Sequence, residues 1–261
     1  MSITSLLILI AVFLLTSAIG IVTGSNSLIA VPVMFEFGIE EKRAVATNMF
    51  ALVFMAIGGA IPFLRQGTVK VRELSPMIVL TIVGSAIGAL IVGLISNGSI
   101  KLIVTIAMIS IVIFTIVRPK RRGEETAETD PRARLDARSL NSLAGYMVVF
   151  LLAIYGGLYS GGYVTVLTAV LVAFFGFSFA GSIAATKVIN IFSSLVATIV
   201  FLYHGLVDIK LGLILGVTMF IGGYLGAHFA SKMNERVLRS IFYGAVFLLA
   251  LKMLFDLLAG R

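Results

Sequence analysis

The residue of this sequence best suited to bind an anion is a lysine within an apolar run. Lys187 belongs to the stretch Ala184–Asn190, inside the mainly apolar run Ser182–Tyr203. A lysine at the centre of a membrane helix costs about 2.5–3.5 kcal/mol on insertion scales, so it needs an anionic partner or a polar cavity. Asn190 shares a helix face with it, which predicts an anion-binding position. Alternatively, Lys187, only about five residues into its run, extends its amine to the membrane surface.

Two glycine-rich breaks interrupt the apolar runs, and each precedes a short apolar segment. The breaks read TGSNS at Thr23–Ser27 and SGGY at Ser160–Tyr163. Glycine permits a tight turn, and the helix that follows offers unpaired N–H groups at its positive end, which suits an anion inside a membrane. The candidate substrate-binding residues in the breaks are Gly24, Ser25, Asn26, Ser27, Gly161, Gly162 and Tyr163. The alternative is that both breaks are only tight turns whose hydroxyls satisfy backbone groups.

An internal repeat relates the two breaks. Displacing the sequence by 138 positions aligns its halves without a gap. The matched glycines include Gly24 with Gly162, Gly67 with Gly205, and Gly88 with Gly226. At the same displacement Thr186 falls on Asn48, so Thr47 and Asn48 form a polar position that corresponds to the lysine segment. We predict that Thr47, Asn48 and Thr186 also belong to the substrate site.

The elements that must position these residues are membrane helices. The chain of 261 residues is 59% hydrophobic and 12% charged, whereas a soluble globular domain has roughly 45–50% apolar and about 25% charged residues. The formal net charge is +8, but the basic residues lie between apolar runs and form no patch of the kind that binds nucleic acid. An integral membrane protein without a nucleic-acid partner is therefore predicted.

The sequence offers no catalytic or cofactor site. It contains no cysteine, and its two histidines are His204 and His228, which excludes thiolate catalysis and leaves no His-rich metal centre. No nucleophile–His–acid set, HExxH motif or Walker-type phosphate loop occurs. We therefore expect no enzyme activity, no metal, no cofactor and no ATP-driven pumping by this chain alone.

Eight apolar runs are long enough to cross a bilayer, which takes about 20 residues. They are Ile3–Val22, Ala44–Leu64, Leu74–Ile95, Ser99–Val117, Asn141–Ser160, Ser182–Tyr203, Leu211–Ala230 and Val237–Leu258. Two shorter runs, Leu28–Phe37 and Val164–Phe177, either cross the membrane or are re-entrant. Between the halves, Arg118–Arg138 carries dense mixed charge and two prolines, which predicts a solvated linker.

The predicted fold is an all-α polytopic membrane protein with two repeats of five helical segments each. Residues 1–117 form the first transmembrane repeat, 118–140 the charged linker and 141–261 the second repeat. Because five is odd, the second repeat is inverted relative to the first. The side with the linker carries thirteen basic residues and the other side five. The positive-inside rule therefore places the linker in the cytoplasm and both termini outside.

The motifs resemble those of the sulfite exporter TauE/SafE family of membrane permeases, also called TSUP. The resemblance rests on GIVTGSNSLIAVPVM, RAVATN and FLRQGTVKV in the first half and on YGGLYSGG, AATKVIN, FLYHGLVDI and IGGYLGAHFA in the second. It covers nearly all of the membrane region and implies small inverted-repeat carriers of sulfur-containing anions in a prokaryotic plasma (inner) membrane. The site residues to which the resemblance points are Gly24, Gly162, Thr186, Lys187 and Asn190.

The leading function hypothesis is a secondary transporter of small anions such as sulfite or sulfoacetate-like organosulfonates, with alternating access between the repeats. One alternative is a carrier or channel for a non-sulfur anion such as a carboxylate. Another is a membrane scaffold that docks a partner through its basic linker. The expected partners are a small anionic substrate and membrane lipid. A proton or sodium as coupling ion and the oligomeric state stay open.

Overall fold

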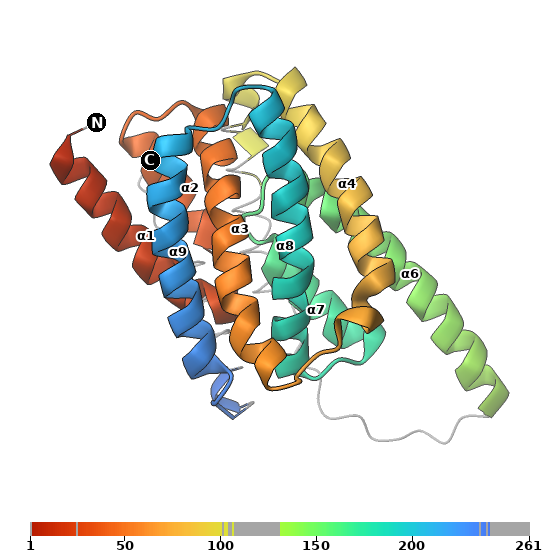
Figure 1. Cartoon of the computed structure of the whole chain (residues 1–261). Helices are drawn as coiled ribbons and strands as arrows, with labels where there is room; N and C mark the ends of the chain where they lie inside the picture. Colours follow the sequence, from red (N-terminus) through yellow and green to blue (C-terminus); the bar gives the residue numbers. More distant parts are fainter. Residues whose placement is uncertain are drawn as a thin grey trace, which may run out of the picture.

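The computed structural model is helical in the part of the chain that it describes (Figure 1). It describes residues 2–24, 26–100, 102, 103, 106, 131–234, 236–238 and 240, with the backbone alone for 131–142. Five of the described helices are long and apolar enough to cross a membrane. Large apolar side chains such as Leu15, Leu90 and Leu225 are exposed on their outer faces, as expected of a surface that contacts lipid.

Six longer helices and two short ones make up the described fold. The longer helices are α1 (Ile3–Thr23), α3 (Glu41–Arg65), α4 (Ser75–Leu94, after the 3-10 turn η1, Val71–Leu74), α6 (Pro131–Leu158), α8 (Phe179–Tyr203) and α9 (Ile209–Ala230). The short helices are α2 (Asn26–Glu36) and α7 (Tyr163–Phe175). The predicted runs Ser99–Val117 and Val237–Leu258 lie largely outside the described residues.

Two helices begin earlier than the apolar pattern predicts. Helix α6 begins at Pro131, so the last part of the predicted linker is helical, because proline favours a first helical turn and the residues after it are good helix formers. Helix α8 begins at Phe179 because the side chain of Ser178 accepts the N–H of Gly181 and caps it. Lys187 therefore lies deeper in its helix than the sequence suggests.

Glycines in the left-handed conformation occupy matched places in the two halves. Every described residue with positive φ is a glycine, and these form three pairs separated by 138 positions. The pairs are Gly24 with Gly162, Gly38 with Gly176, and Gly67 with Gly205. A left-handed residue commonly terminates a helix. The bounds of α3 and α8 also differ by 138 at both ends, so the correspondence extends from sequence to backbone conformation.

Helices α1, α3 and α9 run in the same direction. Gly212 of α9 approaches Phe50 of α3, and one turn further on Gly216 approaches Phe54. The glycine contacts between α9 and α1 likewise advance toward the C-terminal ends of both helices. Small residues at these positions let the helix backbones approach closely. The last described long helix thus packs on two helices of the first half.

Helices α4 and α6 run side by side in the opposite direction. Gly84 and Gly88 of α4 approach, in that order, the carbonyl groups of Phe150 and Ile154 on α6. The C-terminal turn of α4 is joined to the start of α3 by a hydrogen bond from Lys42 Nζ to the carbonyl of Gly93. Helix α4 therefore returns to the side from which α3 enters, and α6 is parallel to it.

Helix α8 also runs opposite to α3, and the two lie in contact at the centre of the molecule (Figure 1). Gly59, in the second half of α3, lies close to the side chain of Lys187. Thr47, near the start of α3, accepts the backbone N–H of Asp208, which follows α8, at 3.0 Å. Two bundles result, α1 with α3 and α9, and α4 with α6 and α8. Each combines helices from both halves of the sequence.

The short helices α2 and α7 fold back instead of crossing. Helices α1 and α3 run in the same direction, and α2 ends only a few residues before α3 begins. It therefore returns to the side from which α1 enters, and α7 does the same between the parallel helices α6 and α8. Both pairs, α1–α2 and α6–α7, are re-entrant hairpins and not full crossings, because the buried hydrogen bonds Thr165–Thr23 and Ser27–Ser160 join their tips inside the protein. They approach from opposite sides.

Candidate functional site

The tips of the two hairpins meet inside the protein. Thr165 Oγ1 donates to the carbonyl oxygen of Thr23 at 2.7 Å, and the hydroxyl oxygens of Ser27 and Ser160 lie 2.7 Å apart. Gly24 turns the first tip with a φ of 70°, and a Cβ atom at this position would lie 2.7 Å from the backbone nitrogen of Thr165. Only glycine permits both the turn and the contact.

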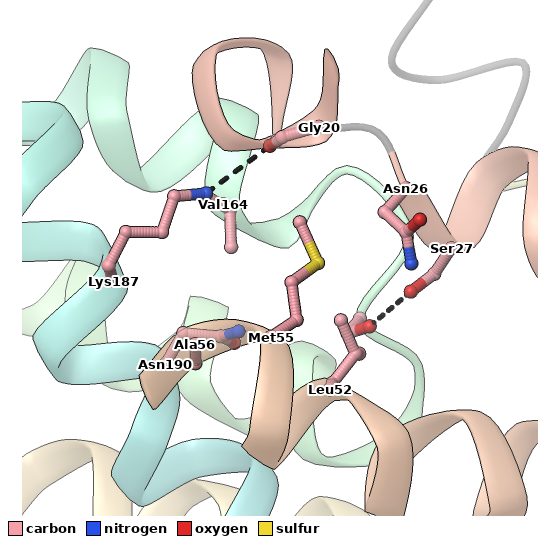
Figure 2. A pocket seen from close by; sticks show the side chains of 11 residues that line it. Gly20, Asn26, Ser27, Leu52, Met55, Ala56, Val164, Lys187 and Asn190 are labelled. Atoms are coloured by element: carbon pink, nitrogen blue, oxygen red, sulfur yellow. Dashed lines mark hydrogen bonds between the residues drawn. The ribbon is translucent and has the colours of Figure 1, made fainter. Parts of the chain in front are cut away.

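A small cavity lies beside the joined tips, half way along α3 and α8 (Figure 2). Its polar lining is Gly20, Gly24, Asn26, Ser27, Ser160, Lys187 and Asn190, and its apolar lining is Leu52, Met55, Ala56 and Val164. The cavity has a volume of about 20 Å³, roughly room for one water. A larger ligand can enter only when these side chains move apart.

Lys187 is buried in this cavity, with 2% of its surface exposed. Its ammonium donates to the carbonyl oxygen of Gly20 at 3.2 Å (Figure 2), and the same oxygen accepts the N–H of Gly24 at 2.9 Å. The salt bridges found in the described part of the chain lie elsewhere, at exposed side chains. The alternative that Lys187 reaches the membrane surface is therefore wrong, because the side chain turns inward from the third turn of α8.

Amide groups with unpartnered atoms line the cavity together with the lysine. Asn26, the first residue of α2, is 4% exposed, and neither atom of its side-chain amide has a partner among the described residues. The same holds for Oδ1 of Asn190, one turn from Lys187. Ser27 accepts a hydrogen bond from Asn48 Nδ2 at 2.9 Å. Because a buried polar group without a partner is costly, a bound ligand can satisfy these amides, and the start of a helix such as α2 also offers backbone N–H groups.

The predicted site residues divide by their place around this cavity. Five line it: Gly24, Asn26, Ser27, Lys187 and Asn190. Asn48 touches it only through Ser27, and Ser25 lies outside the described residues.

The other predicted residues lie outside the cavity lining, in structural contacts. Thr186 Oγ1 donates to the carbonyl of Ile183, and Tyr163 is buried with its ring against Gly156. Gly161 accepts a hydrogen bond from Tyr155, and Gly162 turns the second tip with a φ of 77°. Thr47 Oγ1 accepts the backbone N–H of Asp208 in the turn after α8.

Two polar lining positions were not selected from the sequence. Gly20 lies in the last turn of α1, where helix carbonyls lack partners, and this position could have identified it. Ser160 stands in the second break but pairs with the first. The apolar lining from Leu52 and Met55 carried no sequence signal, since these residues look like any others of a buried helix.

A buried lysine amine beside amide side chains is an arrangement that can bind an anion. Residues 9–253 match the family described as sulfite exporter TauE/SafE. The chain belongs to this family. It is thus an integral membrane protein and a membrane transporter, not an enzyme, as the sequence predicts. No solved structure matches the chain.

Curated relatives of this TauE/SafE protein cover nearly all of it. A probable membrane transporter protein of Haemophilus influenzae is 26% identical over 251 residues, 96% of this chain and 95% of its own length. The probable membrane transporter protein YfcA of Escherichia coli K12 is 25% identical over 249 residues, 95% and 89% of the two chains. The probable membrane transporter protein ORF9 of Sinorhizobium sp is 24% identical over 235 residues, 90% and 87%.

Proposed function

We propose that this TauE/SafE protein is a secondary transporter of small anions, sulfur oxyanions or organosulfonates, which it binds at the joined hairpin tips. Lys187 supplies the positive charge. Asn26 and Asn190 donate side-chain amide hydrogens, and the first turn of α2 adds backbone N–H groups at the positive end of its dipole. Ser27 and Asn48 hold this turn in place through their hydrogen bond.

The observation that carries this proposal is the buried charge of Lys187 opposite unpartnered amides. The ammonium has a carbonyl oxygen as its partner, and a buried cation without a counter-ion is strongly unfavourable. A bound anion removes this cost and at the same time accepts a hydrogen bond from the unpartnered Nδ2 of Asn26. The apolar side chains of Leu52 and Met55 exclude water from the remaining face.

The proposed mechanism is alternating access between two inverted repeats of five segments. The matched glycines and the opposite directions of corresponding helices support it. Since α9 packs on the first half and α4 on the second, the moving bodies are the two mixed bundles. Their displacement separates the hairpin tips and opens the cavity, whose small volume in this structure is that of a closed state.

The proposed orientation keeps the linker in the cytoplasm of a prokaryotic cell and both termini outside. The hydrogen bond between Gln66 and Ser231 places the loops after α3 and α9 at one end of the molecule. Both loops are rich in basic residues, which favours the cytoplasmic side. Reaction of single cysteines, introduced at Gln66 and at Tyr203, with a membrane-impermeant thiol reagent tests the assignment. Only the second is expected to react in intact cells.

Counterflow in proteoliposomes tests transport by the full-length protein. Vesicles loaded with unlabelled methanesulfonate, sulfite, sulfate or acetate are diluted into the labelled anion, and a carrier transiently accumulates the label whereas a channel does not. We expect accumulation with methanesulfonate or sulfite and much less with acetate. Accumulation with acetate alone would move the substrate to the carboxylates, and labelled flux without counterflow would indicate a channel.

Binding measured apart from transport completes the test. The same anions are added to the detergent-solubilised protein during thermal unfolding, because a ligand that binds the folded state raises Tm with concentration. The matched variants are Lys187→Met and Lys42→Met, since both lysines donate to a glycine carbonyl but only the first lies in the cavity. Loss of the Tm shift in both variants, or in neither, would remove Lys187 from the site.

A further inference from the structure

The charge of Lys187 poses a problem for the transporter without substrate. The side chain is 2% exposed, and its hydrogen-bond partner is the carbonyl of Gly20. A carbonyl oxygen orients an ammonium but does not neutralise it. In a permanently charged protein the empty state would therefore carry an unbalanced cation at the centre of the membrane each time the transporter returned without substrate.

The helices packed against α8 offer no described acidic side chain that could balance this charge. Helices α1 and α4 contain no ionisable residue, and α7 contains only Tyr163. The described ionisable side chains of α6 are Tyr146 and Tyr155, and Tyr159 follows that helix. The charged side chains of α3 and η1 lie at helix ends, none of them fully buried: Glu41, Lys42, Arg43, Arg65, Arg72 and Glu73.

The remaining described neighbours of Lys187 also offer no acidic side chain that could balance its charge. On α2 the one charged residue, Glu36, is exposed at the C-terminal end, away from the cavity. The tyrosines are neutral hydrogen-bonding groups. Tyr159 donates to the carbonyl of Ser27 at 2.9 Å, and Tyr155 donates to the carbonyl of Gly161. In the described part of the chain, the charge state of the cavity therefore depends on Lys187 alone.

We infer that Lys187 binds a transported proton, so that one proton and one anion cross the membrane together. The inference rests on the proposed function and adds its coupling ion. The amine accepts a proton when an anion enters, which makes the loaded site an ion pair, and releases it when the anion leaves. Each ligand thus raises the affinity for the other, as thermodynamic linkage requires. Neither the loaded nor the empty site carries net charge.

A strong-acid anion makes proton movement measurable without buffering by the substrate itself. Full-length protein is reconstituted in vesicles with a pH-sensitive dye inside, at about pH 8, and labelled methanesulfonate is added outside at about pH 6. We expect internal acidification that follows anion uptake one to one. The anion should accumulate by up to about 100-fold, because each pH unit corresponds to a tenfold concentration ratio. An imposed membrane potential should leave the uptake unchanged.

Replacing Lys187 by arginine tests the positive charge of this side chain separately from its ability to exchange a proton. Arginine stays protonated in proteins, so Lys187→Arg should still catalyse methanesulfonate counterflow but lose accumulation driven by the pH gradient. The matched control is Lys42→Arg, which replaces the other lysine that donates to a glycine carbonyl and should keep both activities. A cavity too small for arginine would abolish counterflow in the variant. In that case the proton measurement on the unmodified protein decides alone.

The readouts distinguish failure of this inference from failure of the proposed function. Methanesulfonate counterflow without internal acidification would overturn proton coupling and leave the anion transporter intact. Accumulation by Lys187→Arg at the level of the unmodified protein would overturn the role of Lys187. If neither methanesulfonate nor sulfite is exchanged, the proposed function fails and the inference with it.

Discussion

Helices α3 and α8 occupy corresponding places in the two halves but differ where they face the cavity. Their bounds differ by 138 positions at each end, and both cross the centre of the molecule in contact with each other. At the same displacement Lys187 of α8 corresponds to Met49 of α3, and Asn190 corresponds to Leu52. One helix thus presents a cation and an amide where the other presents two apolar side chains.

The two hairpin tips also differ, because the first is polar where the second is apolar. The first tip presents Asn26 with its amide unpartnered, whereas the corresponding residue of the second tip is Val164. The polar tip lies against the polar helix, since Asn26 and Lys187 line one cavity. The two halves therefore offer two corresponding positions, and only one of them carries the buried lysine and the unpartnered amide of the proposed site.

Lys187→Met tests this comparison most severely, because it gives α8 the residue that α3 carries. We expect the affinity for methanesulfonate or sulfite to fall at least about 100-fold, since the only buried cation described is removed. The Tm without ligand should stay the same or rise, because a buried polar amine is replaced by an apolar side chain. Binding isotherms and thermal unfolding measure the two effects. A lower Tm without ligand would instead make Lys187 a structural residue.

Part of the fold could be predicted from the sequence, and part of it could not. Apolar run length predicted α1, α3, α4, α8 and α9, and matched glycines predicted an internal repeat, with which the three pairs of left-handed glycines agree. The start of α6 was missed because run length detects apolar residues, and residues 131–140 form a polar helix. The exchange of α4 and α9 between the halves depends on packing between distant segments, for which one sequence holds no signal.

The sequence identified the site through polar side chains that stand in an apolar run. Lys187 and Asn190 stood out because ionisable and amide groups are costly in an apolar run, and the structure brings both into the cavity. Thr186 and Thr47 were selected through the internal repeat, but the Thr186 hydroxyl donates within its own helix and the Thr47 hydroxyl accepts the N–H of Asp208. Which of several neighbouring polar residues faces a cavity depends on helix rotation, and in an almost wholly apolar run the periodicity that would fix the rotation is weak.

Gly24→Ala is expected to have the next largest effect. It tests whether the hairpin tip differs from an ordinary helix end such as that at Gly38. Gly24 and Gly38 both have positive φ, which costs alanine roughly 1–2 kcal/mol. Only at Gly24 would the added Cβ also meet another chain segment, 2.7 Å from the nitrogen of Thr165, while at Gly38 nothing lies within 4 Å. We expect a loss in stability of about 3 kcal/mol for Gly24→Ala against about 1 kcal/mol for Gly38→Ala.

Thermal or denaturant unfolding of the two variants in the same detergent measures this difference. Transport should fall with Gly24→Ala and persist with Gly38→Ala, because only the first change separates the tips. Equal destabilisation by both changes would show that the tip contact contributes nothing beyond the turn itself.

Asn190→Leu makes a smaller change of the same kind as the lysine substitution, since Leu52 stands at this position of α3. Asn190 is 4% exposed and lines the cavity, where its Nδ2 can donate to the anion. We expect the affinity for the anion to fall about tenfold, the loss of one hydrogen bond to a charged group. Asn97→Leu serves as control, because Asn97 donates to Glu40 at the membrane surface. An unchanged affinity for Asn190→Leu would limit the site to Lys187 and the α2 tip.

The smallest expected effect concerns the contact between α4 and α8, where the two halves again differ. Ser85 and Ser193 share a hydrogen bond of 2.8 Å there, whereas the corresponding contact joins Gly223 of α9 to Met55 of α3. We expect Ser85→Ala and Ser193→Ala each to cost about 1 kcal/mol in stability, with a coupling of similar size in the double-mutant cycle. Anion affinity should not change, because neither serine lines the cavity. A fall in affinity without loss of stability would show that the polar α4–α8 contact belongs to the transport path, and the asymmetry between the halves would then extend beyond the single anion site.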